Sequence, residues 1–417
     1  MTAVIVDPYS TGRLLAPALR RRDHSVIAVQ SRPDLSPTLT ASFVPDDFVA
    51  RFAFDGDLPA LVARLQIFKP DFVLPGNESA VELADRLGAA LGTRGNDPAT
   101  TAMRRNKFAM IERITAAGLL SARQTVVADT GEATRWAARN GWPVVAKPLD
   151  SASSDHVYFC RDAESLAKAV AKIRATRNFC GQTNEQALIQ TYLDGDEYVV
   201  NSVSRGGRHY ICDVLRSAKR SLNDSPFVYD YYRLLRDDDA VVAPLAAYTV
   251  QVLDALGIAE GAGHAEIRIT ARGPTLVEIG ARCMGPLGST TAISQGTGRD
   301  QVALLVDAFD GGAQIEPLLG GRYRFQRDAM VLYLPILVSG RIRELPDLSG
   351  IRALPSVTGA DLLPRIGDMV RPSLDLTQML AKVYLSHADI AVFERDWQRI
   401  RSLEARLQPA VDPSPAA

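Results

Sequence analysis

The sequence predicts a multidomain protein that combines an α/β part with α+β parts. Three observations lead to this prediction. The chain has 417 residues, and domains usually contain roughly 100 to 200. Strand-like and helix-like segments alternate at the N-terminus, which is typical of a parallel sheet covered on both faces. Shorter strands and helices follow in mixed order, which favours α+β units.

Composition excludes several classes of protein. Lys and Arg number 47 against 48 Asp and Glu, so no net charge favours nucleic acid or a membrane surface. No apolar run reaches the about 18 residues that would cross a bilayer. The N-terminal sequence lacks a basic segment followed by a long apolar run, so we expect a cytoplasmic protein. The four cysteines are scattered, and we expect buried free thiols.

Residues 1–95 are predicted to form the N-terminal parallel α/β domain. Its expected strands lie at 3–7, 25–30 and 71–76, and its expected helices lie near 11–22 and 57–68. The turn from Asp7 to Gly12 follows the first strand, where such folds place a ligand loop. It lacks a Gly-x-Gly-x-x-Gly motif, so a structural role is favoured.

The rest of the chain is divided by changes in pattern. Residues 100–118 are predicted to form one helix that ends before Gly118. We expect a central unit at 96–310 with a subdomain at about 122–195, a C-terminal α+β part at 311–407, and a disordered tail at 408–417.

Two strands at 263–270 and 275–280, joined by a turn-like sequence, carry the strongest chemical signal. Side chains alternate between the two faces of a strand, so polar residues gather on one face of this hairpin. Glu266 and Glu278 would then converge on one divalent cation, and carboxylate oxygens favour Mg²⁺ or Mn²⁺. A pair of solvated glutamates is the alternative. The predicted polar face consists of His264, Glu266 and Arg268 on one strand and Leu276, Glu278 and Gly280 on the other.

A phosphate-binding segment is predicted at the end of another apolar strand. Lys147 ends this strand, and a loop of small residues follows. One lysine and several backbone N–H groups can surround phosphate oxygens. Lys107, on the predicted helix 100–118, could reach the same phosphates, although a lone helical lysine is more often solvated. The loop serines are Ser151, Ser153 and Ser154.

The segment 188–198 is predicted to be a strand, a turn at Asp194 and Gly195, and the start of a second strand. A connection between two lobes can offer backbone groups to adenine, and Glu197 can accept hydrogen bonds from ribose hydroxyls. Taken alone, an ordinary hairpin with a solvated acidic turn is the simpler interpretation.

In this order and spacing, these segments resemble the ATP-grasp superfamily and, within it, the carboxylate-amine ligases known as L-amino acid ligases. The resemblance covers nearly the whole chain and is most specific at 263–268 and 276–285. It implies an ATP-grasp fold preceded by a parallel-sheet (pre-ATP-grasp) domain. It also implies ATP and Mg²⁺ or Mn²⁺ as cofactors and small-molecule carboxylates and amines as partners, and it leaves a homodimer open.

The resemblance assigns roles to individual residues. Arg282, four residues beyond Glu278, is expected to steady the reacting phosphate and the acyl phosphate. His264 is expected to reach the substrate pocket. Residues implied to bind ATP are Lys107, Lys147, Ser151, Ser153, Ser154, Gln190, Tyr192, Leu193, Glu197 and Arg268; those implied to bind metal are Glu266 and Glu278; those implied in catalysis are Lys147, His264 and Arg282.

Two departures from the family pattern matter. Many ATP-grasp enzymes carry Glu-x-Asn, whereas this chain has Gly280 two residues after Glu278. Glycine has no side chain to bind metal, and we interpret it as a feature of the amino-acid ligase branch. The phosphate loop has serines and Ala152 where many relatives have glycines, so its backbone is less permissive.

The expected reaction is ATP-dependent formation of an amide between amino acids through an acyl phosphate, with release of ADP and phosphate. A larger natural-product amine or a peptide is an alternative acceptor. A bicarbonate-phosphorylating carboxylase and a nucleotide-binding protein without turnover are further alternatives. The segment 205–236 is expected to contribute to the substrate pocket, although its aromatic and basic residues fit a core or a solvated surface equally well.

Overall fold

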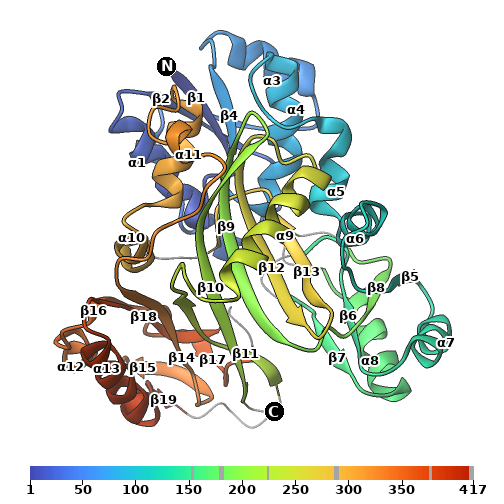
Figure 1. Ribbon diagram of the computed structural model, residues 1–417, viewed down its shortest axis with the longest axis vertical. Coiled ribbons are helices and arrows are strands. Elements are labelled where there is room, and N and C mark those ends of the chain that lie inside the picture. Colours follow the sequence, from blue (N-terminus) through green and yellow to red (C-terminus); the bar gives the residue numbers. More distant parts are fainter. Residues whose placement is uncertain (152–154, 178–182, 223–224, 286–290, 375–377, 413–417) are drawn as a thin grey trace.

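The computed structural model describes residues 1–151, 155–177, 183–222, 225–285, 291–374 and 378–412. Within these residues the strands form four sheets. Figure 1 shows the long strands of the largest sheet running through the middle of the molecule, with the N-terminal segment at one end. A small sheet with its helices and the C-terminal segment lie at the other end, on opposite sides.

The N-terminal sheet has four parallel strands in the order β3-β2-β1-β4. Apolar clusters cover both of its faces, which confirms the predicted parallel α/β architecture. The third strand, β3, was not predicted. The elements are β1 (Thr2–Val6), η1 (Ser10–Leu14), α1 (Leu15–Arg20), β2 (Ser25–Gln30), α2 (Pro37–Thr40), η2 (Pro45–Asp47), β3 (Ala50–Ala53), α3 (Leu58–Gln66), β4 (Phe72–Pro75), η3 (Glu78–Ala80) and α4 (Val81–Leu91).

The turn after β1 has a structural role. The Asp7 carboxylate accepts hydrogen bonds from the backbone N–H and the hydroxyl of Ser31, at 2.7 and 2.5 Å. A Cβ atom on Gly12 would lie 2.2 Å from the carbonyl oxygen of Gly76, so glycine is required where the two backbones meet. The turn therefore anchors the neighbouring loop after β4.

The predicted helix 100–118 is two helices. The backbone of Asn106 is extended, and its side chain accepts hydrogen bonds from the N–H groups of Phe108 and Ala109. An asparagine that caps a helix in this way begins a new helix, which the periodic pattern did not reveal. Gly118 follows the second helix with a positive φ, as expected. The elements are η4 (Pro98–Thr100), α5 (Thr101–Arg105) and α6 (Lys107–Ala116).

A small antiparallel sheet is built from strands that all lie within the predicted subdomain at about 122–195. Its order is β5-β8-β6-β7, and its two helices bury their apolar faces in one cluster with it. The elements are β5 (Gln124–Val127), α7 (Thr130–Asn140), β6 (Val144–Lys147), β7 (Tyr158–Cys160), α8 (Ala163–Arg174) and β8 (Ala187–Thr191).

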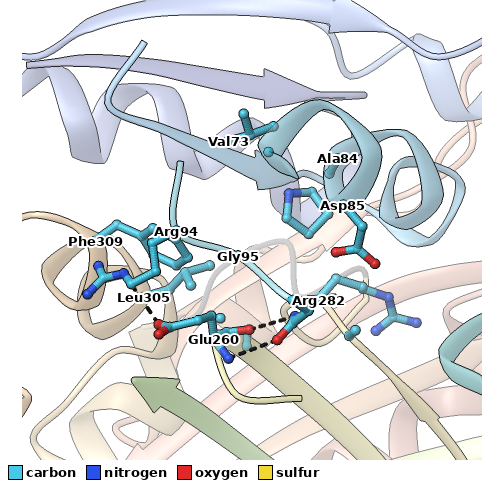
Figure 2. Close-up of a pocket in the computed structure, with 15 residues that line it drawn as sticks. Val73, Ala84, Asp85, Arg94, Gly95, Glu260, Arg282, Leu305 and Phe309 are labelled. Carbon is cyan, nitrogen blue, oxygen red and sulfur yellow. Dashed lines mark hydrogen bonds and ion pairs between the residues drawn. The ribbon is translucent and has the colours of Figure 1, made fainter. Parts of the chain in front are cut away.

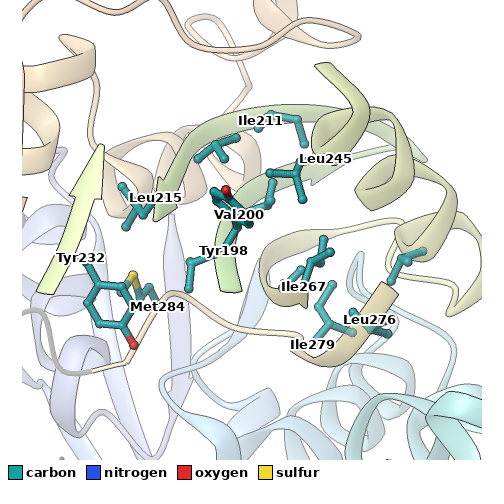
Figure 3. Packing of buried hydrophobic residues seen from close by; sticks show 14 of the residues in the cluster. Tyr198, Val200, Ile211, Leu215, Tyr232, Leu245, Ile267, Leu276, Ile279 and Met284 are labelled. Carbon is teal, nitrogen blue, oxygen red and sulfur yellow. The ribbon is translucent and has the colours of Figure 1, made fainter. Parts of the chain in front are cut away.

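The largest sheet has eight strands in the order β13-β12-β9-β10-β11-β14-β18-β16. It runs across the predicted boundary between residues 310 and 311, because β11 pairs with β14. Figure 3 shows part of the apolar cluster on one face. The elements are β9 (Asp196–Arg205), β10 (Arg208–Leu222), β11 (Ser225–Leu234), α9 (Val242–Ala255), β12 (Gly261–Thr270), β13 (Gly273–Gly280), β14 (Asp328–Pro335), β16 (Val357–Leu362) and β18 (Met379–His387).

The segment 205–236 contributes mainly to this sheet and its core. Tyr229 and Tyr232 are buried in the cluster of Figure 3, and their rings contact that of Tyr333. Of the three interpretations of this segment's aromatic residues, namely substrate pocket, core and solvated surface, the core interpretation holds for these two tyrosines.

The predicted disordered tail, residues 408–417, begins too early in the sequence. Residues 410–412 pair with β15, and Gln408 accepts a hydrogen bond from the backbone N–H of Leu337 at 2.8 Å. This segment is short and rich in proline and alanine, so only a partner distant in sequence reveals the strand. The remaining elements are α10 (Thr291–Thr297), α11 (Gln301–Phe309), η5 (Glu316–Leu318), β15 (Gly340–Glu344), α12 (Ser349–Arg352), β17 (Met369–Val370), α13 (Ile390–Leu403), η6 (Glu404–Arg406) and β19 (Ala410–Asp412).

Cys160, Cys212 and Cys283 are free and buried, as expected, and Cys180 lies outside the described residues. In the described part of the chain, no helix combines the length and the apolar character needed to span a membrane.

Candidate active site

The hairpin of β12 and β13 brings two carboxylates together. Glu266 and Glu278 lie directly opposite each other in the antiparallel register. The next pair is Ile267 with Leu276, so Val277 has no partner across the hairpin and forms a β-bulge. Leu276 therefore packs in the apolar core, and its predicted place on the polar face with Glu278 is wrong. The bulge reverses the alternation at that point.

Lys107 links this hairpin to the phosphate loop. Its Nζ lies 3.0 Å from Oε2 of Glu278 and donates a hydrogen bond to the backbone carbonyl of Ser151. Burial would raise the pKa of Glu278, but the charges of Lys107 and Lys147 outweigh it and lower this pKa to about 2. Lys107 is the first residue of α6, so the Asn106 cap places it here.

Lys147 is the last residue of β6 and is buried. Burial lowers its pKa to about 8, although the negative charges of Glu278 and Glu266 act to raise this pKa. The Ser151 hydroxyl donates a hydrogen bond to Asp155 at 2.7 Å. Ser153 and Ser154 lie outside the described residues. Together, the side chains of Lys107, Lys147, Glu266 and Glu278 form one charged cluster.

Residues 192–195 connect β8 of the small sheet with β9 of the large sheet. This is the linker position expected of the segment. The Tyr192 ring faces the guanidinium of Arg268 at 5.1 Å, and the Leu193 carbonyl accepts a hydrogen bond from Arg268 at 2.8 Å. The Gln190 side chain donates to Gln124 at 3.0 Å. The guanidinium group of Arg268 thus lies against the linker.

Glu197 is the centre of a second charged cluster. Its carboxylate accepts hydrogen bonds from Lys219 at 2.7 Å, Ser217 at 3.1 Å and Arg268 at 3.1 Å. Burial would raise the pKa of Glu197, but Lys219 and Arg268 hold it below its ordinary value. Sequence reasoning missed Lys219. The register that places Ser217 opposite Glu197 is a long-range property of β9 and β10.

Arg282 follows β13 and binds a residue that sequence reasoning also missed. Its Nε lies 2.9 Å from Oε2 of Glu78, in the loop after β4, and Arg105 donates to the other oxygen of the same carboxylate. Ligands of parallel α/β sheets bind beyond the carboxyl ends of the strands, a rule that could have drawn attention to Glu78.

His264 is held by a buried polar chain. Its Nδ1 lies 2.9 Å from Oδ1 of Asn201, whose amide donates to Asp213 at 2.7 Å. On the other side of the ring, Nε2 lies 3.7 Å from Oε1 of Glu266. Burial raises the pKa of Asp213 to about 7. The imidazole therefore lies next to one of the paired carboxylates.

A cavity of about 30 Å³ lies behind Arg282, between the N-terminal sheet and the large sheet. Figure 2 shows Arg282 and Asp85 on one side of it and Arg94, Glu260 and Phe309 on the other. The volume is about that needed by a single water. This cavity is too small for a substrate.

The paired carboxylates fit a magnesium ion. Among the described residues, no group of three or more His, Cys, Asp or Glu side chains could hold a metal. Mg²⁺ is usually bound by one or two carboxylates together with water and substrate phosphates, so two glutamates beside two lysines are a suitable set.

The structure therefore brings most of the predicted site residues into two adjoining clusters. Lys219 connects them: burial would lower the pKa of its amine, but the charges of Glu197, Tyr229 and Glu266 outweigh burial and raise this pKa. One cluster contains Lys107, Lys147, Ser151, His264, Glu266, Glu278 and Arg282; the other contains Gln190, Tyr192, Leu193, Glu197 and Arg268.

A family model described as an ATP-grasp domain matches residues 140–291. The chain is 31% identical over 417 residues to "Dapdiamide A synthase" from Enterobacter agglomerans, and the match covers 96% of this chain and 95% of that protein. The structure of L-amino acid ligase from Bacillus licheniformis matches with a TM-score of 0.77 and 18% identity over 99% of both chains. N5-carboxyaminoimidazole ribonucleotide synthetase from Thermotoga maritima matches with a TM-score of 0.70 and 13% identity over 99% of both chains.

Proposed function

This chain belongs to the ATP-grasp carboxylate-amine ligases, which form amide bonds with the use of ATP, and from that premise we propose that it joins two amino acids. The observation that carries the proposal is the cluster of Lys107 and Lys147 beside the paired Glu266 and Glu278. Such a cluster suits a polyphosphate and a divalent cation. The amino-acid class is carried over from the ligase whose fold this chain shares.

The proposed chemistry begins with activation of a carboxylate. A carboxylate oxygen forms a bond to the γ-phosphorus of ATP as the bond to the bridging oxygen breaks, so ADP leaves and an acyl phosphate forms. An amine nitrogen, which loses a proton at or before attack, then attacks the acyl carbon, and phosphate leaves with the electron pair of the C–O bond. No covalent bond to the protein is needed, so the route requires no nucleophilic cysteine or serine.

The residues of the site supply binding and positive charge. Lys107 and Lys147 would hold phosphate oxygens, and Arg282 would offset charge on the transferred phosphoryl group. Magnesium held by Glu266 and Glu278 would add positive charge at the phosphate oxygens. His264 lies beside Glu266, where we propose that it contacts the substrates.

The nucleoside end is proposed from the second cluster. The linker of Gln190, Tyr192 and Leu193 would contact adenine, and Glu197 would face the ribose. Both Glu197 oxygens already accept hydrogen bonds from basic residues, so a ribose hydroxyl would join an ordered network. Lys147 is on the small sheet, and we propose that this sheet covers the acyl phosphate against water.

Product analysis tests this proposal. Purified protein is incubated with ATP, Mg²⁺ and pairs of amino acids, and we expect ADP, phosphate and a dipeptide detected by mass spectrometry. Hydroxylamine in place of the second amino acid should give a hydroxamate of the carboxylate substrate alone. This identifies which partner is activated.

Other results would contradict the proposed reaction or indicate a different function. Release of AMP and pyrophosphate would contradict the acyl phosphate. ADP formation that depends on bicarbonate would indicate a carboxylase. A product with a larger amine or a peptide, but not with amino acids, would move the acceptor to natural-product chemistry. ATP binding without ADP release for any pair would indicate a nucleotide-binding protein.

A further inference from the structure

Glu78 and Arg282 meet at the active site although they are distant in sequence. Nε of Arg282 lies 2.9 Å from Oε2 of Glu78, and the side chains are 13% and 15% exposed. The other oxygen, Oε1, accepts a hydrogen bond from Arg105. One carboxylate from the N-terminal unit therefore holds two arginines, one with each oxygen.

The loop that carries Glu78 is fixed on both sides of this residue. The Asn77 amide donates to the backbone carbonyl of Asp7 at 2.9 Å, and the Ser79 hydroxyl donates to the Asp7 carboxylate at 2.5 Å. A Cβ atom on Gly76 would lie 2.3 Å from the Asp7 carbonyl oxygen, so the two backbones are in contact. Glu78 therefore projects from an anchored loop.

Gly280 provides the space into which Glu78 extends. A Cβ atom at this position would lie 2.7 Å from Oε2 of Glu78 and 3.1 Å from the Cζ atom of Arg282. Gly280 is not among the glycines with positive φ, so its backbone conformation also suits other residues. A methyl group here would displace the ends of these two side chains, at the position where many ATP-grasp enzymes have the asparagine of Glu-x-Asn.

Arg282 is held at two of its three nitrogens. Glu78 binds Nε, and Nη1 donates to the backbone carbonyl of Cys283 at 3.0 Å. Neither bond uses Nη2. Two bonds fix the plane of a guanidinium group, and an arginine fixed before the reaction needs no reorganisation when charge develops.

We propose that Glu78 is a positioning residue that orients Arg282, and that Gly280 is required because a larger side chain would displace this pair. The inference rests on the proposed function, in which Arg282 acts on the transferred phosphoryl group. It also accounts for Gly280 at the metal-binding strand: the place of the usual asparagine side chain is taken by a carboxylate from the N-terminal unit.

A double-mutant cycle in turnover tests the proposal. Glu78→Ala should lower kcat of ligation by roughly 10- to 100-fold, because a small misplacement of a catalytic group has effects of this order. The KM values for both substrates and ATP should change little. In an Arg282→Ala background, Glu78→Ala should cause no further loss. Glu78→Gln should recover part of kcat, since an amide oxygen still accepts a hydrogen bond from Arg282.

Additive losses in this cycle would overturn the proposal, because Glu78 would then act independently of Arg282. A higher KM for either substrate in Glu78→Ala, also in the Arg282→Ala background, would overturn it as well and would show that Glu78 binds substrate directly.

A pair of glycine variants tests the role of space. Gly280→Ala should lower kcat about as much as Glu78→Ala, because the added methyl group would push the ends of Glu78 and Arg282 out of position. Gly95→Ala is the matched control, because Gly95 lines the cavity of Figure 2 and a Cβ atom there has no neighbour within 4 Å. Wild-type kcat in Gly280→Ala would overturn the proposal.

Thermal unfolding provides a readout that does not depend on turnover. The Tm change of the double variant should be smaller than the sum of the changes in Glu78→Ala and Arg282→Ala, because the two residues share one interaction. Additive changes would mean that the contact is absent, and the proposal would be wrong. If the variants show coupled Tm changes but the wild-type protein shows no ligation, the proposed function fails while the contact stands.

Discussion

In the proposed mechanism, the charge of Arg282 matters mainly during the reaction rather than before it. Its guanidinium is fixed by Glu78 and by the backbone at Cys283, beside the cluster of Lys107 and Glu278. A cation that interacts with the transition state more than with bound ATP changes kcat more than KM.

We therefore expect Arg282→Ala to lower kcat by about 10²- to 10³-fold, the usual effect of removing one such donor. ATP affinity should stay near that of the wild type. Arg282→Lys should recover little, because an ammonium cannot bind Glu78 and the transferred phosphoryl group with a planar fork. Steady-state kinetics with calorimetry of ATP binding measures both quantities. Unchanged kcat with a raised KM for ATP would make Arg282 a binding residue only.

We expect Lys147 to make ATP binding sensitive to pH. Burial lowers its pKa to about 8 in the free protein. Phosphates of ATP beside this amine would favour its charged form and raise the pKa in the complex. Binding that depends on this charge is fully present below the pKa of the free protein. It is lost as pH rises from there towards the pKa of the complex.

We expect the Kd for ATP to increase by up to about tenfold for each pH unit above this pKa, with proton uptake on binding. Titration calorimetry in buffers of different ionisation enthalpy measures both. Lys147→Ala should bind ATP weakly with no such pH dependence, and its circular dichroism spectrum should match that of the wild type. Wild-type ATP affinity and turnover in Lys147→Ala would show that the phosphate site lies elsewhere.

At the scale of elements, we expect the hairpin of β12 and β13 to contribute both to metal binding and to stability. Glu278 is bonded to buried Lys107, whereas Glu266 faces His264 at 3.7 Å. Removing one partner of a buried ion pair leaves a charge that is poorly compensated. Substitution of either glutamate should therefore have the same effect on metal use, whereas the effects on stability should differ.

We expect Glu266→Gln and Glu278→Gln both to raise the Mg²⁺ concentration needed for half-maximal ADP formation. In metal-free buffer, Glu278→Gln should lower stability by about 1–3 kcal/mol, and Glu266→Gln by clearly less. Mg²⁺ titrations and thermal unfolding separate the two effects. An unchanged Mg²⁺ requirement in both variants would remove these residues from the metal site.

At the scale of the whole molecule, the C-terminal segment closes the sheet of β15, β17 and β19. Gln408 accepts a hydrogen bond from Leu337 and donates one to Pro335, and β19 pairs with β15. This segment binds the end of β14, the residues that follow it and β15, so its removal should loosen the C-terminal part.

A chain ending at residue 407 should lose about 1–2 kcal/mol from these hydrogen bonds. At roughly 2–4 °C per kcal/mol, its Tm should fall by several degrees. A chain ending at residue 412 keeps β19 and is the matched control, with Tm expected within 1 °C or so of the wild type. Equal Tm values for the two truncated chains would show that β19 contributes nothing to stability.

The sequence by itself determined the features that depend on near neighbours. The parallel N-terminal sheet, the hairpin with Glu266 and Glu278, and Lys147 at a strand end follow from alternating patterns within a few residues. The small sheet also follows from such patterns, because each of its strands is short, apolar and bounded by turn residues.

The tertiary structure alone decided which distant residues meet. Glu78 reaches Arg282, and Lys219 reaches Glu197, through contacts that no local period contains. The bulge at Val277, which moves Leu276 into the core, depends on how β13 pairs with β12. The physical reason is that register, bulges and ion pairs between segments are selected by the packing of the whole sheet, whereas strand and helix patterns reflect the burial of one segment at a time.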